Sequence, residues 1–396
     1  MKHLHLLTLL AALAFAGCDK DDSSSMQPVT SDFDPAFARI LQEKGYIPDA
    51  ENITTVDTDN LAAITELDVS GDYGDPGPLT SLRGIEHFKS LTTLYCKNNQ
   101  LTELDVSQNT KLAYLDCYAN QLTALDVSRN TALTTLYCSD NSLTSLDISR
   151  NTALIELDCS NNPLASLDVS QNTKLMYMRC YSNELTELEL PQNSGLIELN
   201  CGANRLTKLD VSHHTELRWL ECSSNDLTEL DVSANTELTE LWCSSNELTE
   251  LDVSRNTALV ELWCSSNQLL ELDVSQNPNL ISLKCGDNPL TELDVRQNPD
   301  LTSLECGDNQ LTKLDISRNT GLMYLYCSSN ELTELDISRN TALMYLSCGD
   351  NPGDGISTFP ITAWFDNATI PDNLGFPKKE WQYGDRLITI DFRKAE

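Results

Sequence analysis

Histidine and basic residues are scarce in this sequence, and each shortage removes a class of function. Only 5 of the 396 residues are His, and after residue 5 they are His87, His213 and His214, which leaves little material for histidine-based catalysis. Lys and Arg number 26 against 60 Asp and Glu, which gives a net charge of −34 at pH 7. A chain this acidic repels nucleic acid and anionic membrane surfaces. Basic proteins, glycans and divalent cations remain as partners.

Recognisable catalytic motifs are also missing. The sequence contains no nucleophile–base pair, no glycine-rich phosphate loop and no metal-ligand spacing. Carboxylates recur along the whole chain, so a pair of them says little about glycosidase chemistry. The sequence therefore predicts a protein that is not an enzyme and that needs no cofactor or metal.

Long apolar runs are absent except at the start of the chain. Residues 4–16 are largely apolar, but a bilayer span needs about 20 such residues. With Lys2 before them and small residues after them, they predict a secretory signal peptide over residues 1–17. The stretch from Ala14 to Cys18 resembles the lipobox of bacterial lipoproteins, although Phe15 stands where a Leu is usual. That resemblance implies acylation of Cys18, and the lipid would be the only contact with a membrane.

A short polar segment follows Cys18, and its composition predicts a flexible acidic tether over residues 18–32. The run Lys20-Asp21-Asp22 resembles the surface-export signal of Bacteroidota lipoproteins. The resemblance implies an outer-membrane protein that faces the cell exterior. A periplasmic orientation is the alternative.

A 21-residue repeat occupies most of the chain. Thirteen of the 14 Cys recur at intervals of 21 residues, and an Asn stands three residues after each of them. The thirteen are Cys96, Cys117, Cys138, Cys159, Cys180, Cys201, Cys222, Cys243, Cys264, Cys285, Cys306, Cys327 and Cys348. The unit reads L-x-x-L-x-C-x-x-N-x-L-T-x-L-D-V-S-x-N-T-x. It resembles the leucine-rich-repeat signature with Cys at a core position, and it predicts thirteen repeats over residues 91–351.

The spacing predicts a leucine-rich-repeat solenoid. In Leu-x-Cys the two named side chains point one way and their neighbours the other, as in a strand. Successive coils would stack these strands into a parallel β-sheet on one face, at a spacing of about 4.8 Å. On the other face we expect turns and a short extended segment or second strand at Leu-Asp-Val. The Asn after each Cys is expected to bond backbone groups of its own and neighbouring coils.

Both ends of such a solenoid need caps, because an end coil would otherwise expose its core. Residues 33–90 are predicted to form the N-terminal cap with degenerate repeats, including a short amphipathic helix over residues 33–45. Residues 352–396 are predicted to form a β-rich C-terminal cap with a closing strand around Leu387 to Ile390. Seven aromatic residues of this segment are interpreted as cap core rather than as a ligand site: Phe359, Trp364, Phe365, Phe376, Trp381, Tyr383 and Phe392.

The repeated Cys would suggest disulfides in an exported protein. Thirteen is an odd number, however, and in-register Cβ atoms about 4.8 Å apart exceed the roughly 3.5–4.5 Å of a disulfide. Metal binding would require ligands that converge from several directions. We therefore expect a ladder of free, buried thiols. The repeat region resembles the internalin-like surface proteins that carry such a ladder, as internalin J does. This resemblance implies adhesion, but the lipid anchor differs from internalin wall attachment, and the ligand does not carry over.

Positions that vary between coils indicate where a ligand would bind. The outward positions lie three before, one before and one after each Cys, and they hold nine of the twelve Tyr and three of the five Trp. Large exposed aromatics mark binding surfaces. The candidate ligand-binding residues are Tyr114, Tyr118, Tyr137, Tyr177, Arg179, Tyr181, Trp219, Glu240, Trp242, Glu261, Trp263, Tyr324, Tyr326 and Tyr345. Further outward residues are Tyr95, Asp116, Glu156, Asp158, Glu198, Glu221 and Glu305. Aromatics flanked by carboxylates suit sugar rings or a basic protein.

Two plainer interpretations stand beside this one. Tyr and Trp favour strands for packing alone, and the copies of Glu-Leu-Trp-Cys-Ser-Ser-Asn at residues 240 and 261 are compatible with a simple duplication.

A column of acids on the other side raises calcium bridging as a possible role: Asp105, Asp126, Asp147, Asp168, Glu189, Asp210, Asp231, Asp252, Asp273, Asp294, Asp315 and Asp336. No calcium loop motif supports it, and Asp side chains in such turns also cap backbone N–H groups.

The sequence favours a non-enzymatic adhesion or ligand-capture protein at the cell surface. Its partner would be a protein or glycan of a host or of a neighbouring cell. The alternatives are a structural surface spacer without a specific ligand and, less favoured, an accessory protein in glycan processing.

Overall fold

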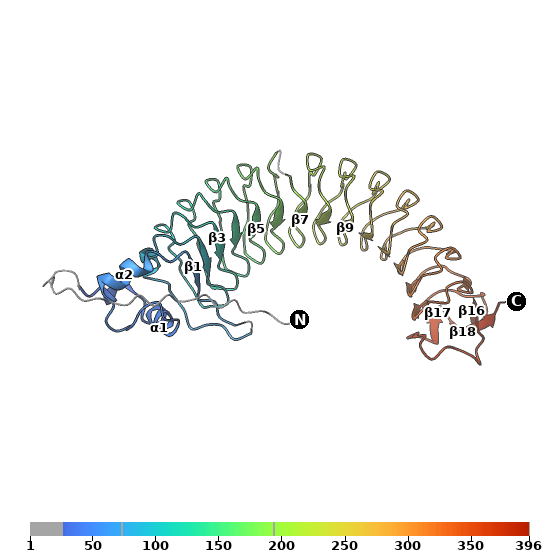
Figure 1. Cartoon of the computed structure of the whole chain (residues 1–396). Helices are drawn as coiled ribbons and strands as arrows, with labels where there is room; N and C mark the ends of the chain where they lie inside the picture. The colour runs from blue at the N-terminus through green and yellow to red at the C-terminus, as the bar shows by residue number, and fades with distance from the viewer. Residues whose placement is uncertain (1–26, 73, 193–194, 396) are drawn as a thin grey trace.

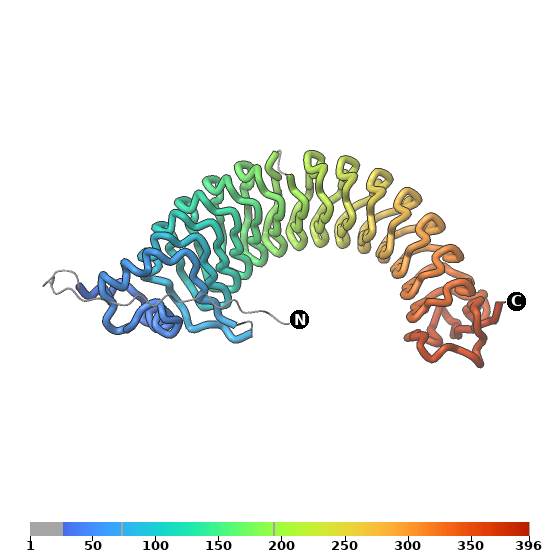
Figure 2. Tube along the Cα trace, in the orientation of Figure 1, coloured from blue at the N-terminus to red at the C-terminus, as the bar shows by residue number. Residues whose placement is uncertain are grey.

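The structure, a computed structural model, describes residues 27–72, 74–192 and 195–395. It shows stacked coils that form an arch, with helices near the N-terminal end and a small group of strands at the C-terminal end (Figure 1). The coils follow one another evenly along the arch (Figure 2). The expected signal peptide, Cys18 and most of the expected tether lie outside the described residues. No described helix combines the length and the apolar character that crossing a membrane would require.

The helices all precede the first full coil. They are η1 (Thr30–Asp32), α1 (Pro35–Glu43), α2 (Thr55–Leu61) and η2 (Ile85–His87). Helix α1 begins where Asp34 accepts hydrogen bonds from the backbone N–H groups of Ala36 and Phe37, at 2.9 and 3.0 Å. It buries Phe37 and Leu41 against the first coils, which confirms the helix expected there.

One parallel sheet of fourteen strands runs along the solenoid. Its strands are β1 (Glu66–Asp68), β2 (Thr93–Tyr95), β3 (Tyr114–Asp116), β4 (Thr135–Tyr137), β5 (Glu156–Asp158), β6 (Tyr177–Arg179), β7 (Glu198–Asn200), β8 (Trp219–Glu221), β9 (Glu240–Trp242), β10 (Glu261–Trp263), β11 (Ser282–Lys284), β12 (Ser303–Glu305), β13 (Tyr324–Tyr326) and β15 (Tyr345–Ser347). The middle residue of each strand is buried, and equivalent positions pair in register, as Leu241 does with Leu262. The predicted solenoid and its sheet are confirmed.

The Asn that follows each strand joins its own coil to the preceding one, as expected. The Asn225 side-chain N–H donates to the carbonyl oxygens of Cys201 and Cys222, at 3.1 and 3.0 Å. Its carbonyl oxygen accepts from the backbone N–H of Leu206 at 2.9 Å. Because these partners belong to two coils, each Asn ties the strand ends of neighbouring coils together.

All thirteen ladder cysteines are free thiols in the core, and the side chain of Cys222 is 0 % exposed. Burial raises the pKa of every one of them; for Cys201 and Cys264 the pKa rises to about 12. The prediction of a reduced, packed ladder is confirmed, because the thiols replace aliphatic side chains at the sheet-side core.

The Leu-Asp-Val segments on the opposite side lie outside strands in every described coil but the last. In most coils the Asp side chain accepts a hydrogen bond from the backbone N–H two residues on, for example Asp231 from Ser233 at 2.8 Å. This local turn competes with strand pairing between coils. Only Leu335–Asp336 forms a strand, β14, and its partner comes from the C-terminal cap.

The C-terminal cap covers the last coil with strands β16 (Thr358–Ala363), β17 (Glu380–Tyr383) and β18 (Arg386–Lys394), in the order β14-β16-β18-β17. Phe359, Trp381 and Phe392 are buried in it. The Trp381 indole N–H donates to the carbonyl oxygen of Asn351 at 2.9 Å, so the cap satisfies a backbone acceptor that no further coil would reach. The aromatic residues of this segment therefore build a cap core, as expected.

Candidate ligand-binding face

The residues predicted to bind a ligand lie together on the outward side of the fourteen-stranded sheet, which we call the sheet face. Register pairing places them in columns, so that the residue three before each Cys stands beside its equivalent in the next coil. Most of these side chains are half-buried, and Tyr324 is the most open at 40 % exposed. The sheet face thus brings the predicted aromatics within reach of one extended ligand.

The aromatics form three groups along the face. The first is Tyr95, Tyr114 and Tyr137, with ring centroids 5.0 and 5.6 Å apart in succession. The second is Trp219, Trp242 and Trp263. The third is Tyr326 and Tyr345, 5.1 Å apart, with Tyr324 in the same strand as Tyr326. Burial and the nearby Asp116 raise the pKa of Tyr114 to about 12, so its hydroxyl stays protonated at neutral pH.

One predicted outward acid departs from expectation. Asp116 is only 3 % exposed. Its carboxylate lies 3.2 Å from the Lys97 ammonium and accepts the Tyr118 backbone N–H at 3.2 Å. Burial raises the pKa of Asp116 against the opposing effect of these two donors. Neighbouring side chains enclose this position, and it supports the tyrosine group rather than offering a charge to solvent.

The three tryptophans form a continuous ridge on the sheet face. The rings of Trp242 and Trp263 stack in parallel, with centroids 4.1 Å apart and an interplanar angle of 4°. Trp219 meets Trp242 edge-on at 5.6 Å. The Lys284 ammonium lies 3.6 Å from the Trp263 ring centroid, a cation–π contact within the chain. We refer to Trp219, Trp242 and Trp263 as the tryptophan ridge.

This geometry limits the ring surface that the ridge offers to a ligand. One face of Trp263 contacts Trp242, and Lys284 lies over the ring. Trp242 lies between Trp263 and Trp219. Both faces of the Trp263 ring are therefore occupied within the chain. Lys284 was absent from the predicted site; its place one coil after Trp263, in the same column, was the available signal.

Charge on the sheet face is unevenly balanced. The Arg179 guanidinium lies between two glutamates, 3.7 Å from Glu156 and 3.2 Å from Glu198. Glu240 and Glu261 stand side by side in adjacent strands, and neither forms an ion pair with any residue that the structure describes. Burial, then Glu261 and Glu198, raise the pKa of Glu240. This pair is a local concentration of uncompensated negative charge.

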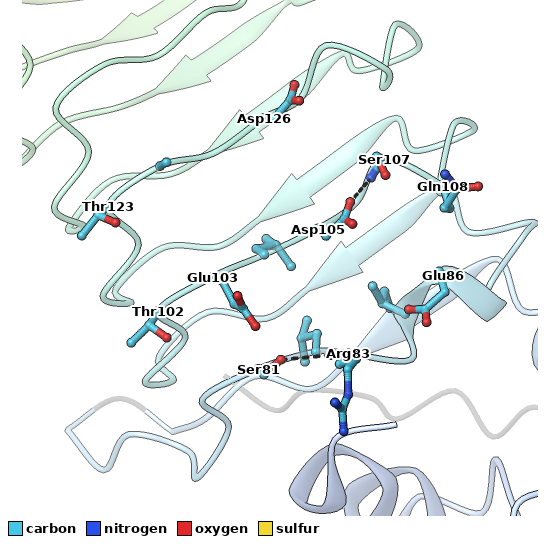
Figure 3. Close-up of a pocket in the computed structure, with 14 residues that line it drawn as sticks. Ser81, Arg83, Glu86, Thr102, Glu103, Asp105, Ser107, Gln108, Thr123 and Asp126 are labelled. Carbon is cyan, nitrogen blue, oxygen red and sulfur yellow. Dashed lines mark hydrogen bonds between the residues drawn. The ribbon is translucent and has the colours of Figure 1, made fainter. Parts of the chain in front are cut away.

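A hollow of about 670 Å³ lies on the opposite flank, between the N-terminal cap and the first coils. Figure 3 shows Asp105 bonded to Ser107 and, nearer the cap, Arg83 bonded to Ser81. Arg83 also donates to the carbonyl oxygen of Phe33 at 3.0 Å. These polar groups are occupied in holding the turn and the cap, and no nucleophile–base pair converges there.

The Asp column follows this flank, and its carboxylates are engaged locally. Hydrogen bonds from Ser233 and Ser254 lower the pKa of Asp231 and Asp252. Within the described ranges, no group of three or more His, Cys, Asp and Glu side chains is arranged to hold a metal ion. The column thus offers turn caps, and the geometry adds no support for calcium bridging.

Comparison with known proteins gives the same architecture. A family model described as leucine-rich repeats (2 copies) matches residues 89–130 and 131–172. The functional domain of InlJ from Listeria monocytogenes, whose description includes a cysteine ladder, is 37 % identical, with a TM-score of 0.72 over 85 % of this chain and 82 % of that one. No curated protein matches the chain.

Two further solved structures share the fold. The internalin InlF from Listeria monocytogenes is 23 % identical with a TM-score of 0.68, over 83 % of this chain and 99 % of that one. The leucine-rich-repeat protein LIC12759 from Leptospira interrogans is 25 % identical with a TM-score of 0.60, over 74 % of this chain and 92 % of that one. Because it carries a ladder of buried cysteines and these repeats, the chain belongs to the leucine-rich-repeat family, among the internalin-like proteins with a cysteine ladder.

Proposed function

We propose that this protein is a non-enzymatic adhesion or ligand-capture protein that binds a protein or glycan through the sheet face. The observation that carries the proposal is the gathering of nine of twelve Tyr and three of five Trp on that face, while the core positions hardly vary. Aromatic side chains supply large contact areas, and binding energy concentrates on them. Relationship to internalins supports a binding role, because the internalin-like fold is typically a binding scaffold.

The tryptophan ridge is the expected centre of binding. Replacing both Trp242 and Trp263 by Ala should weaken binding by about 2–4 kcal/mol, the range for central aromatic anchors. A glycan and host-protein array probed with the purified protein would supply the ligand, and titration calorimetry would measure the change. The matched control is Thr123→Ala with Thr144→Ala, two exposed positions away from the sheet face.

Melting curves must accompany this titration, because the ridge side chains are half-buried and stack on one another. Full affinity in a folded double Trp variant would rule out the ridge as the binding centre. If the array yields no ligand for the unaltered protein, the result would favour the alternative of a structural spacer without a specific ligand.

We further propose that the protein is anchored at the outer membrane through acylated Cys18, facing the cell exterior. The support is the apolar run followed by Gly17-Cys18 and the Lys-Asp-Asp run after it. Cys18→Ser should release the protein from the membrane fraction. The variant loses the acyl chains, and a dozen apolar residues are too few to span a bilayer. Detection of Cys18 without acyl chains by mass spectrometry would contradict the proposed anchor. Protease shaving of intact cells would test exterior display.

A further inference from the structure

The sheet face contains its own example of how a guanidinium is held. Arg179 projects from β6 and lies between Glu156 of β5 and Glu198 of β7, at 3.7 and 3.2 Å. A planar guanidinium with several N–H donors suits this arrangement, because it can address two carboxylates at once. At this point along the arch, the chain itself neutralises the outer column of glutamates.

The same column carries carboxylates further along that have no such partner. Glu240 and Glu261 are register neighbours on β9 and β10, and no cation of the described chain pairs with either of them. The nearby basic side chain Lys284 lies over the Trp263 ring instead. Like charges at neighbouring positions of a sheet repel each other, so a cation brought in from outside would relieve this repulsion.

The tryptophan ridge beside these carboxylates presents carbon to solvent. The indole nitrogens of Trp219 and Trp242 are buried and bond to no described group, so the parts of both rings that solvent reaches are carbon atoms. An arginine side chain matches such a surface, since its methylenes pack on apolar atoms while its head group stays polar. A neutral sugar brings no charge to the glutamates, and it finds both faces of Trp263 already covered.

We propose that the ligand is a basic polypeptide segment, and that one of its arginines lies along the tryptophan ridge with its guanidinium bridging the adjacent carboxylates of Glu240 and Glu261. The inference rests on the proposed function and names the partner class for the same face. It follows from charge complementarity. Arg179 shows that glutamates of this column can hold a guanidinium, there from the strands on either side of its own. The acidic charge of the whole chain would draw such a segment in, and the glutamate pair would fix where it binds.

The test is a titration of the full protein, at physiological ionic strength, with a fluorescent arginine–glycine peptide and its citrulline counterpart. Glu240→Gln with Glu261→Gln should weaken binding of the arginine peptide by about tenfold or more, the loss of a charge-assisted contact. Glu250→Gln with Glu271→Gln changes the net charge equally in the same two coils but on the opposite flank, and should weaken binding less than about twofold.

Three results would overturn the inference: equal weakening by both glutamate pairs, no weakening by Glu240→Gln with Glu261→Gln, or equally tight binding of the citrulline peptide. Binding of neutral oligosaccharides that the Glu240–Glu261 change leaves intact would also overturn it, in favour of a glycan ligand. The proposed function fails separately. If the double Trp variant loses an array ligand that the Glu240–Glu261 variant still binds, the arginine site is wrong and the binding face stands.

Discussion

Raising the pH from 7 to about 9.5 is expected to unfold the solenoid. In the unfolded chain a thiol ionises with a pKa of about 8.5. In the folded core burial keeps the thiol neutral, and the pKa of Cys306 and Cys348, for example, is raised to about 12. The folded state therefore binds protons more tightly. The contribution of the neutral thiols to the free energy of unfolding is complete below about pH 8.5. It is lost as the pH rises from there toward the folded pKa.

Repetition makes this loss large. Each thiol withdraws about 1.4 kcal/mol of unfolding free energy per pH unit once the unfolded thiol is ionised. Thirteen thiols are buried in the described core. Their combined loss by pH 9 is on the order of 5–10 kcal/mol, which is comparable to the whole stability of a typical domain.

Urea unfolding in a thiol-free reductant, at a series of pH values from 7 to 9.5, would measure this dependence. A variant with Cys222, Cys243 and Cys264 all changed to Ala is the control, since it should lower the number of protons released on unfolding by three. A thiol reagent at neutral pH should label the native ladder slowly and the unfolded ladder completely. A urea midpoint that does not move up to pH 9.5 would contradict the argument.

Replacing Asn225 by Asp should lower the free energy of unfolding by about 3–5 kcal/mol, the range for a buried charge without a partner. The substitution keeps the shape of the side chain but turns the donating N–H group into an oxygen. That oxygen would face the carbonyl oxygens of Cys201 and Cys222, which Asn225 now contacts at 3.1 and 3.0 Å. Repulsion then replaces the hydrogen bonds that this amide donates, at a position only 7 % exposed.

Urea unfolding at pH 7 measures the effect, with hydrogen exchange around β8 and β9 to locate it. The matched control is Asn279→Asp, because the Asn279 side chain also donates to a backbone carbonyl, that of Thr257, but at an exposed position. It should change stability by no more than about 0.5 kcal/mol. Equal losses for the two variants would show that the buried ladder contacts add nothing to stability.

The repeating part of this fold could be predicted from the sequence because one physical requirement acts on every coil. Each coil needs a Cys or Leu that faces the core and an Asn that bonds two coils. Because these residues recur at a fixed interval, the interval alone predicts where Cys222 and Asn225 lie in their coil. A second Asn file was equally visible and was not predicted: Asn235 donates to the carbonyl oxygens of Val211 and His214 in the preceding coil, at 2.9 and 2.8 Å.

The candidate site was less predictable, because it depends on side-chain torsions rather than on spacing. The columns placed Trp242 beside Trp263, but nothing in the sequence said that the rings would stack on each other rather than lie flat. The sequence also did not determine whether the Lys284 ammonium would contact the Trp263 indole, as it does, or the neighbouring Glu305. The burial of Asp116 is of the same kind, since it follows from how its neighbours close over it.

The strict register of the sheet has a consequence for how the protein can change over time. Residues 240–246 and 261–267 have the same sequence, and their strands pair position for position. Unequal recombination between such copies would add or remove a whole coil. Each event would lengthen or shorten the arch by about 4.8 Å and leave every inward side chain inward, because the period of the pattern is untouched. The reach of the molecule can therefore be altered in discrete steps without redesigning its interior.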